Sequence, residues 1–166
     1  MNEAHDRKHP FRLSPEAYTD CRTPIFLTMC FKPRSPIDET LAGLMQQVVE
    51  TQSRRWGLAL HAYCLMPNHV HIVLSVSRDG SDFEMFVRRT KAEFSRRAHR
   101  SGSTGFTWER SFWDRHAREE EQVRVRIEYT LDNPVRKGLC RRREEWPWAK
   151  YYGWTLGEDE IVPERD

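Results

Sequence analysis

Two histidines separated by one residue stand at the start of a run of aliphatic residues. The segment from His69 to Val76 reads His-Val-His-Ile-Val-Leu-Ser-Val, a composition typical of a β-strand. Because successive side chains on a strand point to opposite faces, His69 and His71 share one face and the aliphatic row takes the other. Their backbone positions would lie about 7 Å apart, at a rise of roughly 3.3 Å per residue. Both imidazoles could then bind one divalent cation; a structural histidine pair is the alternative.

A tyrosine follows on the polar side of a helical segment. Val123, Ile127 and Leu131 recur every four residues, which predicts a helix whose apolar stripe faces the core. Tyr129 comes two residues after Ile127, about 200° around the helix, so its phenol points away from that stripe. Asn133 is one turn further along and shares the side of Tyr129 if the helix persists that far. A phenol beside a cation is a candidate nucleophile; an ordinary surface tyrosine is the alternative.

The elements that must position these groups follow from hydrophobic periodicity and turn residues. We expect strands at 23–31, 58–65, 69–76 and 108–117, and helices at 38–56, 82–99 and 119–132. Pro67 and Asn68 form a turn that joins two of the strands into a hairpin, and Pro134 is expected to end the last helix. The order β-α-β-β-α-β-α predicts an α+β fold of the ferredoxin-like split βαβ type. Such an antiparallel sheet carries helices on one face, with the metal and tyrosine site on the open side.

The composition fits one domain. The chain has 166 residues, and we divide it into a polar arm (1–22), a domain (23–140) and a C-terminal extension (141–166) that packs partly on the domain. No apolar stretch is long enough to span a membrane, and the start lacks the apolar core of a signal peptide, so we expect a cytoplasmic protein. Four cysteines without a Cys-x-x-Cys pair favour free thiols over disulfides or a zinc site.

Positive charge is concentrated away from the C-terminus. The chain carries a net charge of +2 although its last nine residues hold five acids and one arginine. Basic clusters of this kind suit a polyphosphate partner, although a solvated helix face would have the same composition. We therefore list as DNA-binding candidates Arg88, Arg89, Lys91, Arg96, Arg97, Arg110, Arg136 and Lys137. Trp108, Phe112 and Trp113 could stack on unpaired bases or fill the core.

Several of these segments, in this order, resemble one known family. Residues 63–74 (YCLMPNHVHIVL) resemble the histidine strand of the insertion-sequence single-tyrosine (HUH) transposases, and residues 129–139 (YTLDNPVRKGL) resemble their nucleophile helix and the run after it. Residues 108–116 (WERSFWDRH) are similar to the segment between them. Residues 146–151 (WPWAKY) are similar to the tail of the REP-associated tyrosine transposase branch. The resemblance spans about residues 23–152.

The resemblance implies an activity, a cofactor and a partner. Family members bind single-stranded or hairpin DNA together with Mg²⁺ or Mn²⁺, and they cleave and rejoin it through a 5′-phosphotyrosine intermediate. Carried over to this chain, Tyr129 is the nucleophile, His69 and His71 hold the metal, and Asn133 stands where the family often places a third ligand. Imidazole ligands favour Mn²⁺ or a mixed ligand set, because Mg²⁺ prefers oxygen. A monomer and a homodimer both remain open.

Other functions could use parts of the same pattern. A histidine-triad hydrolase would need a third histidine where this chain has Val73. Relaxases and replication initiators also combine a metal ion with a tyrosine nucleophile, but the small size of this chain favours a transposase. An RNA-binding ferredoxin-like domain would carry aromatic residues on its central strands. A non-catalytic, domesticated DNA-binding protein remains the main alternative, and formation of a covalent protein–DNA adduct would distinguish the two.

Overall fold

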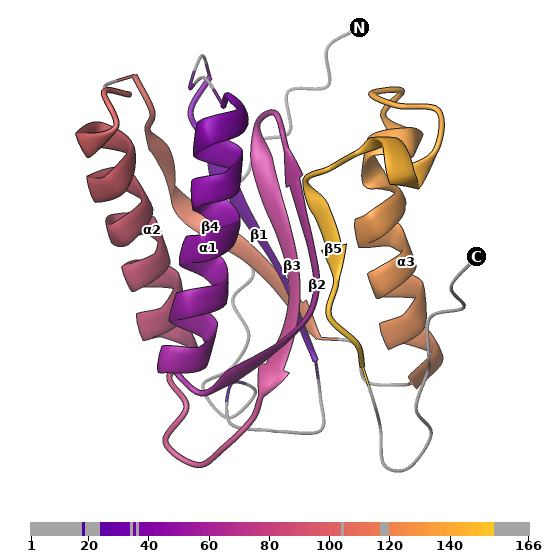
Figure 1. Ribbon diagram of the computed structural model, residues 1–166. Coiled ribbons are helices and arrows are strands. Elements are labelled where there is room, and N and C mark those ends of the chain that lie inside the picture. The colour runs from indigo at the N-terminus through magenta and orange to yellow at the C-terminus, as the bar shows by residue number, and fades with distance from the viewer. Residues whose placement is uncertain are drawn as a thin grey trace, which may run out of the picture.

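A sheet and three long helices make up the described part of the chain. The computed structural model describes residues 18, 24–33, 35, 37–103, 105–116 and 120–154, apart from the side chains of 116, 120 and 121. In chain order the elements are β1 (Ile25–Phe31), α1 (Glu39–Arg55), β2 (Leu58–Met66), β3 (His69–Val76), α2 (Phe83–Arg100), β4 (Trp108–His116), α3 (Glu120–Arg136), η2 (Arg143–Glu145) and β5 (Ala149–Tyr151) (Figure 1). The first seven follow the predicted order.

The strands form one antiparallel sheet in the order β4-β1-β3-β2-β5. The first four strands have the arrangement of a split βαβ fold, so the predicted fold class is confirmed. The predicted turn at Pro67 and Asn68 joins β2 to β3, and it pairs Met66 with His69. The short edge strand β5 was not predicted; it brings the aromatic C-terminal segment against β2.

One face of the sheet is covered by α1 and α2. Each helix begins at an aspartate whose carboxylate accepts a hydrogen bond from a backbone N–H of the first turn: Asp38 caps α1 and Asp82 caps α2. The apolar row of β3, including Ile72 and Leu74, is buried in the core between these helices and the sheet. Successive side chains of a strand point to opposite faces, so the histidines of β3 lie on the face away from α1 and α2.

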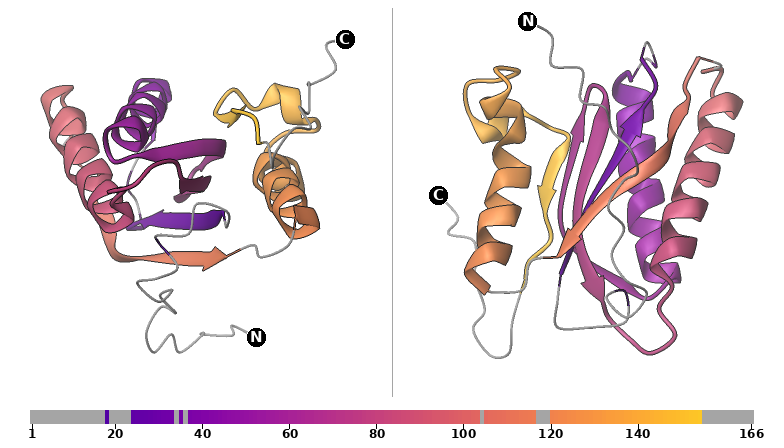
Figure 2. Two further views of the ribbon diagram at one scale, coloured as in Figure 1. Left: turned by 90° about the horizontal axis from the view of Figure 1, so that it is seen from below. Right: turned by 180° about the vertical axis from the view of Figure 1, so that it is seen from behind.

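The second face, predicted to be open, is partly covered by α3 (Figure 2). The predicted stripe of Val123, Ile127 and Leu131 packs there with Phe26 of β1 and Val73 of β3 in a second, smaller core. An apolar stripe of this width must be buried against something, and the face already covered by α1 and α2 has no room for a third helix. The nucleophile candidate is therefore held directly above the histidine face.

The prediction that Pro134 ends the last helix is wrong, because α3 continues to Arg136 with Pro134 inside it. Lys137 donates its backbone N–H to the Asn133 carbonyl at 3.0 Å, and Gly138, at φ +69°, then ends the helix in the left-handed region. A proline inside a helix costs roughly 3 kcal/mol, which the burial of Pro134 and Leu131 offsets. Asn133 therefore lies one helical turn after Tyr129.

The two ends of the chain are described only in part. The predicted arm, residues 1–22, lies outside the described residues except for Tyr18, whose ring stacks on Phe83 with centroids 4.6 Å apart. Of the C-terminal extension, residues 141–154 are described; Trp154 belongs to the smaller core beneath α3. No helix in the described ranges is both long and apolar enough to cross a bilayer. Cys30, Cys64 and Cys140 are free thiols.

Candidate active site

The two histidines of β3 converge on one point. Their Nε2 atoms lie 3.0 Å apart, and the ring centroids are 4.4 Å apart with the planes at 73°. His71 is buried and His69 is half-buried, and both lie on the sheet face beneath α3. The prediction that His69 and His71 share one face is confirmed, and their rings are close enough for a single small ion to meet both Nε2 atoms.

The other ring nitrogen of each histidine is held by a polar side chain. Nδ1 of His69 lies 2.6 Å from Asn68 Oδ1, and Nδ1 of His71 lies 2.8 Å from Thr28 Oγ1. An amide oxygen can only accept, so Nδ1 of His69 donates and its Nε2 carries the lone pair. Thr28 Oγ1 can likewise accept a hydrogen bond from Nδ1 of His71, which leaves the lone pair on Nε2 of that ring. Such partners fix the tautomer in which both Nε2 atoms are available to a metal.

Burial keeps both imidazoles neutral. It lowers the pKa of His69 to about 4, with the charge of Lys137 acting in the same direction. Burial lowers the pKa of His71 to about 3, and His69 and Lys137 lower it further. A metal ligand must be in its neutral form, and these two histidines meet that condition at neutral pH.

Tyr129 lies beside this pair, as its position off the apolar stripe predicted. Its ring centroid is 6.2 Å from that of His71 and 6.3 Å from that of Phe26. Phe26 also stacks on His71, with centroids 5.2 Å apart, so one ring touches both site residues. Tyr129 is 36% exposed, which leaves its ring accessible from solvent. The guanidinium of Arg136, two turns further along α3, lies 5.0 Å from the centre of the Tyr129 ring.

Asn133 provides a buried oxygen on the same helix. The residue is 2% exposed, and its Oδ1 accepts no hydrogen bond from any part of the chain that the structure describes. A buried acceptor without a donor costs about 1–3 kcal/mol, which an ion or a donor brought by a ligand would offset. Within the described ranges no three His, Cys, Asp or Glu side chains form a metal cluster. Among the residues that the structure describes, the amide of Asn133 is therefore the candidate for a third donor to the histidine pair.

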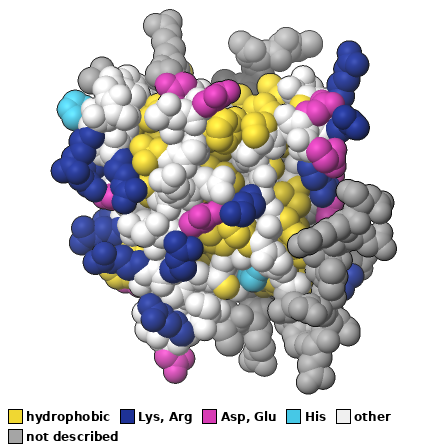
Figure 3. Space-filling view, viewed as in Figure 1, with side chains coloured by type: hydrophobic (Ala, Val, Ile, Leu, Met, Phe, Trp, Pro, Cys, Tyr) yellow, Lys and Arg dark blue, Asp and Glu magenta, His cyan; other side chains and the backbone are white. Residues whose placement is uncertain are grey.

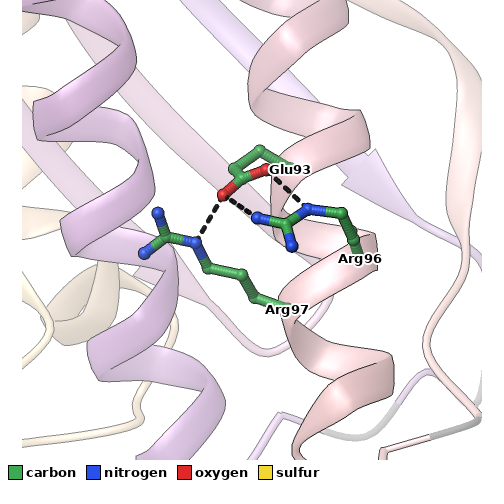
Figure 4. A network of polar contacts seen from close by, with 3 residues as sticks. All are labelled: Glu93, Arg96 and Arg97. Carbon is green, nitrogen blue, oxygen red and sulfur yellow. Dashed lines mark hydrogen bonds and ion pairs between the residues drawn. The ribbon is translucent and has the colours of Figure 1, made fainter.

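The basic residues predicted to bind DNA fall into two groups. Arg136 and Lys137 are exposed at the end of α3, on the side of the histidine pair. The residues of α2 lie across the sheet from it. Arg96 and Arg97 both pair with Glu93, and these contacts lower the pKa of Glu93 to about 2, the hydrogen bond from Arg96 being the largest cause (Figure 4). Arg96 and Arg97 thus share one carboxylate, and the three side chains together keep a net charge of +1.

Two further candidates are occupied by contacts within the protein. Lys91 Nζ donates to the carbonyls of Glu109 and Ser111 on the edge strand β4. Trp108 donates its indole N–H to the Lys91 carbonyl and packs in an aromatic cluster with Phe31. Trp108 is therefore not a free stacking surface for bases, and Phe112 is buried in the larger core.

Three exposed arginines remain from the predicted set. Arg88, Arg89 and Arg110 stand on α2 and β4, and Arg88 and Arg110 line a cavity of about 410 Å³ between these elements. None of the three is brought to the histidine pair, because α2 covers the opposite face of the sheet. These arginines could contact DNA only at a distance from the histidine pair.

Sequence reasoning missed four residues that shape the site. Thr28 and Asn68 hold the histidine rings, and Phe26 touches His71 and Tyr129. Arg143 pairs with Glu128 and Asp132 on either side of Tyr129 in α3. Only Asn68 had a signal in the sequence, since it directly precedes His69; the others depend on strand pairing or tertiary contacts.

Comparison with known proteins agrees with this geometry. The family model described as "Transposase IS200 like" matches residues 21–125, a range that includes both histidines and ends before Tyr129. The REP-associated tyrosine transposase of Escherichia coli (strain K12) is 23% identical over 119 residues, which are 72% of this chain and 70% of that protein. A Haemophilus influenzae protein named for the same class is 22% identical over 114 residues, 62% of this chain and 63% of that protein.

A solved structure shows the same fold. It is described as a REP-associated tyrosine transposase bound to a REP hairpin, and it matches with a TM-score of 0.71 at 21% identity, over 96% of this chain and 99% of that one. The family model covers well over half of the present sequence, and the resemblance seen in its motifs is thereby confirmed. The chain belongs to the IS200-like transposase family.

Proposed function

We propose that this protein cleaves and rejoins single-stranded or hairpin DNA, with Tyr129 as the nucleophile and His69 and His71 as ligands of a divalent cation. The observation that carries the proposal is the convergence of these groups from two separate elements. The Nε2 atoms of the β3 histidines lie 3.0 Å apart, and the phenol ring on α3 lies 6.2 Å from His71. Core packing alone would not explain why two neutral imidazoles and a partly exposed phenol lie together.

The proposed reaction is a transesterification. The phenol oxygen of Tyr129 attacks the phosphorus of a DNA phosphodiester, the bond from phosphorus to the 3′-oxygen breaks, and a 5′-phosphotyrosine forms. The phenol proton passes to solvent, and the departing 3′-oxygen takes one up. Attack by a 3′-hydroxyl on the phosphotyrosine reverses these steps and joins the strands, so no external energy source is needed. Arg136 holds its positive charge over the Tyr129 ring, where it can attract the DNA phosphate towards the nucleophile.

The donor set fits a Mg²⁺ or Mn²⁺ ion. His69 and His71 would bind it through Nε2, and Asn133 would add Oδ1, the buried oxygen that lacks a donor among the described residues. A bound ion would supply positive charge to the phosphate oxygens and so make the phosphorus easier to attack. Two nitrogen ligands and one amide oxygen suit Mn²⁺ better than Mg²⁺.

Hairpin DNA is the substrate to test first. The solved relative with the same fold is bound to a hairpin, and the exposed Arg136 and Lys137 stand at the end of α3 nearest the histidine pair. Each phosphate contact made by such residues releases counterions, so binding should weaken steeply with salt. Arg88, Arg89 and Arg110 remain candidates for backbone contacts further from the cleaved bond.

The test is the formation of a covalent adduct. The protein is incubated with an end-labelled hairpin that carries unpaired flanks, with Mn²⁺, and the products are separated under denaturing conditions. We expect an adduct that peptide mapping assigns to Tyr129, no adduct with Tyr129→Phe, and a normal adduct with the control Tyr151→Phe. His71→Ala should bind the hairpin but not cleave it.

The same experiment tests the non-catalytic alternative. Tight hairpin binding without any adduct, in Mn²⁺ and in Mg²⁺, would identify the protein as a DNA-binding member that has lost the chemistry. An adduct mapped to another residue would overturn the assignment of Tyr129, and normal cleavage by His71→Ala would overturn the metal site.

A further inference from the structure

Helix α3, which carries Tyr129, borders a cavity of about 830 Å³ on the side of the C-terminal segment. Ile127 and Leu131 line this cavity from the helix, and Tyr151 and Trp154 line it from the segment that contains β5. Van der Waals contact is lost across a cavity, because the atoms on its walls have no close partners on one side. Packing along this flank therefore does little to stop α3 from turning about its own axis.

The direction of Tyr129 depends on that rotation. A helix with its side chains is about 10–12 Å across, so a turn of about 10° moves a side chain at its surface by about 1 Å. In a site that needs aligned groups, a displacement of this size can lower the rate by about a hundredfold. The ring of Tyr129 lies 6.2 Å from that of His71, and keeping it there requires a contact that holds the rotation of α3.

Arg143 makes such a contact, because it bonds to α3 at two points. Its Nη2 pairs with Glu128 Oε2, and its Nε and Nη2 lie 2.8 and 2.7 Å from Asp132 Oδ1. Glu128 directly precedes Tyr129, and Asp132 lies one turn after Glu128 on the same side of the helix. Figure 3 shows side chains of both charges beside one another over this part of the molecule, at the upper right. A planar guanidinium held at two positions one turn apart resists rotation of the helix.

The other end of Arg143 is fixed to the sheet. Trp146 donates its backbone N–H to the Arg143 carbonyl at 3.1 Å, and it donates its indole N–H to the carbonyl of Leu65 on β2 at 2.9 Å. The Leu65 N–H in turn donates to the Trp148 carbonyl at 2.9 Å. Because β2 pairs with β3, this series of bonds connects the strand beside the histidines to the helix that carries Tyr129.

We propose that Arg143 is a positioning residue: its bridge to two carboxylates of α3 holds the helix at the rotation that directs Tyr129 towards the histidine pair. The inference rests on the proposed function and deepens it. The side chain of Arg143 is 33% exposed, and a salt bridge at that exposure contributes little to the free energy of unfolding. Loss of the bridge should therefore change the position of Tyr129 more than the stability of the protein.

An electrostatic role for Arg143 makes a different prediction. Glu128 and Asp132 are two negative charges near the nucleophile, and Arg143 lowers their repulsion of DNA phosphate. Arg143→Gln removes both the bridge and this shielding. Glu128→Gln combined with Asp132→Asn, called the double amide variant, removes the bridge and the repulsion together. If Arg143 positions α3, both proteins should show the same defect.

The first measurement uses neither DNA nor metal. The protein is labelled with 3-fluorotyrosine, and the ¹⁹F signal of Tyr129 is assigned by its absence in Tyr129→Phe. We expect Arg143→Gln and the double amide variant to shift or broaden this signal, and to leave unchanged the signal of Tyr63, which is buried in the core on the other face of the sheet. Arg142→Gln, whose guanidinium pairs with Glu145 of η2, is the matched control. An unchanged Tyr129 signal in Arg143→Gln would overturn the inference.

Cleavage rates show whether this position matters for the reaction. At saturating hairpin with Mn²⁺, we expect Arg143→Gln to lower the rate by about ten- to a hundredfold, while the hairpin concentration that gives half the maximal rate changes by less than about threefold. Arg143→Lys keeps the charge and should recover part of the rate. In the double amide variant, Arg143→Gln should cause no further loss, because the bridge is already gone. Urea unfolding checks that each variant is folded.

The possible results separate this inference from the proposed function. A double amide variant that binds the hairpin more tightly and cleaves at the unmodified rate would mean that Arg143 only shields the carboxylates, and the inference would be wrong. Normal cleavage by Arg143→Gln would also remove the inference and leave the proposed function standing. If even the unmodified protein forms no adduct, the proposed function fails, while the fluorotyrosine signal still decides whether Arg143 places Tyr129.

Discussion

The ring of Tyr129 lies 6.2 Å from the ring of His71, and Phe26 packs against both. The three rings come from α3, β3 and β1, so the spacing between nucleophile and metal ligand depends on how the helix sits on the sheet. Phe26 is 9% exposed and fills the space beneath the helix. Its size therefore fixes how closely the phenol approaches the histidine pair.

Replacing Phe26 with leucine should misplace Tyr129 without removing either the phenol or the metal ligands. We expect Mn²⁺ affinity to change by less than about threefold, while the cleavage rate falls by about ten- to a hundredfold, because small displacements are costly in a preorganised site. The control is Phe112→Leu, an equally buried ring in the core on the other face. A rate that falls equally in both variants would show that lost stability, and not misplacement, is the cause.

Replacing Thr28 with valine should weaken metal binding. Valine has the shape of threonine but cannot accept the hydrogen bond from Nδ1 of His71, so the ring loses its fixed tautomer. Loss of such a partner typically costs ten- to a hundredfold in metal affinity, and Mn²⁺ titration followed by calorimetry or spin resonance would measure it. Thr28→Ser, which keeps the hydroxyl, should restore most of the affinity; equal affinity for Mn²⁺ in the valine and serine variants would contradict the role.

The parts of the site that were predictable are those set by local periodicity. Alternation along β3 placed His69 and His71 on one face, and the helical repeat placed Tyr129 off the apolar stripe. Both patterns are read within one element, where covalent geometry determines direction. The split βαβ order followed from the same local signals, since few topologies join such elements with short connections.

The parts that could not be predicted depend on pairing between distant segments. Thr28 meets His71 only because β1 and β3 pair in a register that sets Thr28 opposite His71, and no pattern within β1 gives that register. The basic residues of α2 show the same limit. Their charge was visible in the sequence, and Glu93 pairs with Arg96 and Arg97 within the same helix, but the place of α2 across the sheet from the histidines depends on packing.

Arg136 should contribute to the cleavage step more than to DNA affinity. Its guanidinium lies over the Tyr129 ring, so Arg136→Gln removes the positive charge that lies beside the nucleophile. We expect the cleavage rate at saturating hairpin to fall by about tenfold, in keeping with a cation–π contact of about 1–2 kcal/mol, and Arg136→Lys to recover part of it. Arg89→Gln on α2 is the matched control and should leave that rate unchanged. A loss confined to hairpin affinity would instead make Arg136 a simple phosphate contact.

Acidification should destabilise the metal-free protein through its buried histidines. Burial lowers the pKa of His61 and also lowers the pKa of His69 to about 4 and of His71 to about 3, against an ordinary value of 6.5. Above 6.5 the folded and unfolded chains both carry neutral imidazoles, and the full stability is present. As the pH falls from 6.5 towards 4 and then 3, the histidines of the unfolded chain become protonated while those of the folded chain remain neutral. The free energy of unfolding therefore decreases over that pH range.

Urea unfolding followed by circular dichroism would measure this effect. The midpoint urea concentration of the metal-free protein should fall between pH 6.5 and about 4, and His71→Gln should show a smaller fall because one of the titrating groups is gone. His99→Gln, which removes an exposed histidine of α2, is the control and should follow the unmodified protein. Saturating Mn²⁺ should raise the midpoint at neutral pH and lose that effect on acidification, since protons and metal compete for the same imidazoles. A midpoint that falls equally in His71→Gln and in the unmodified protein would mean that carboxylates, and not this histidine, govern the acid limit.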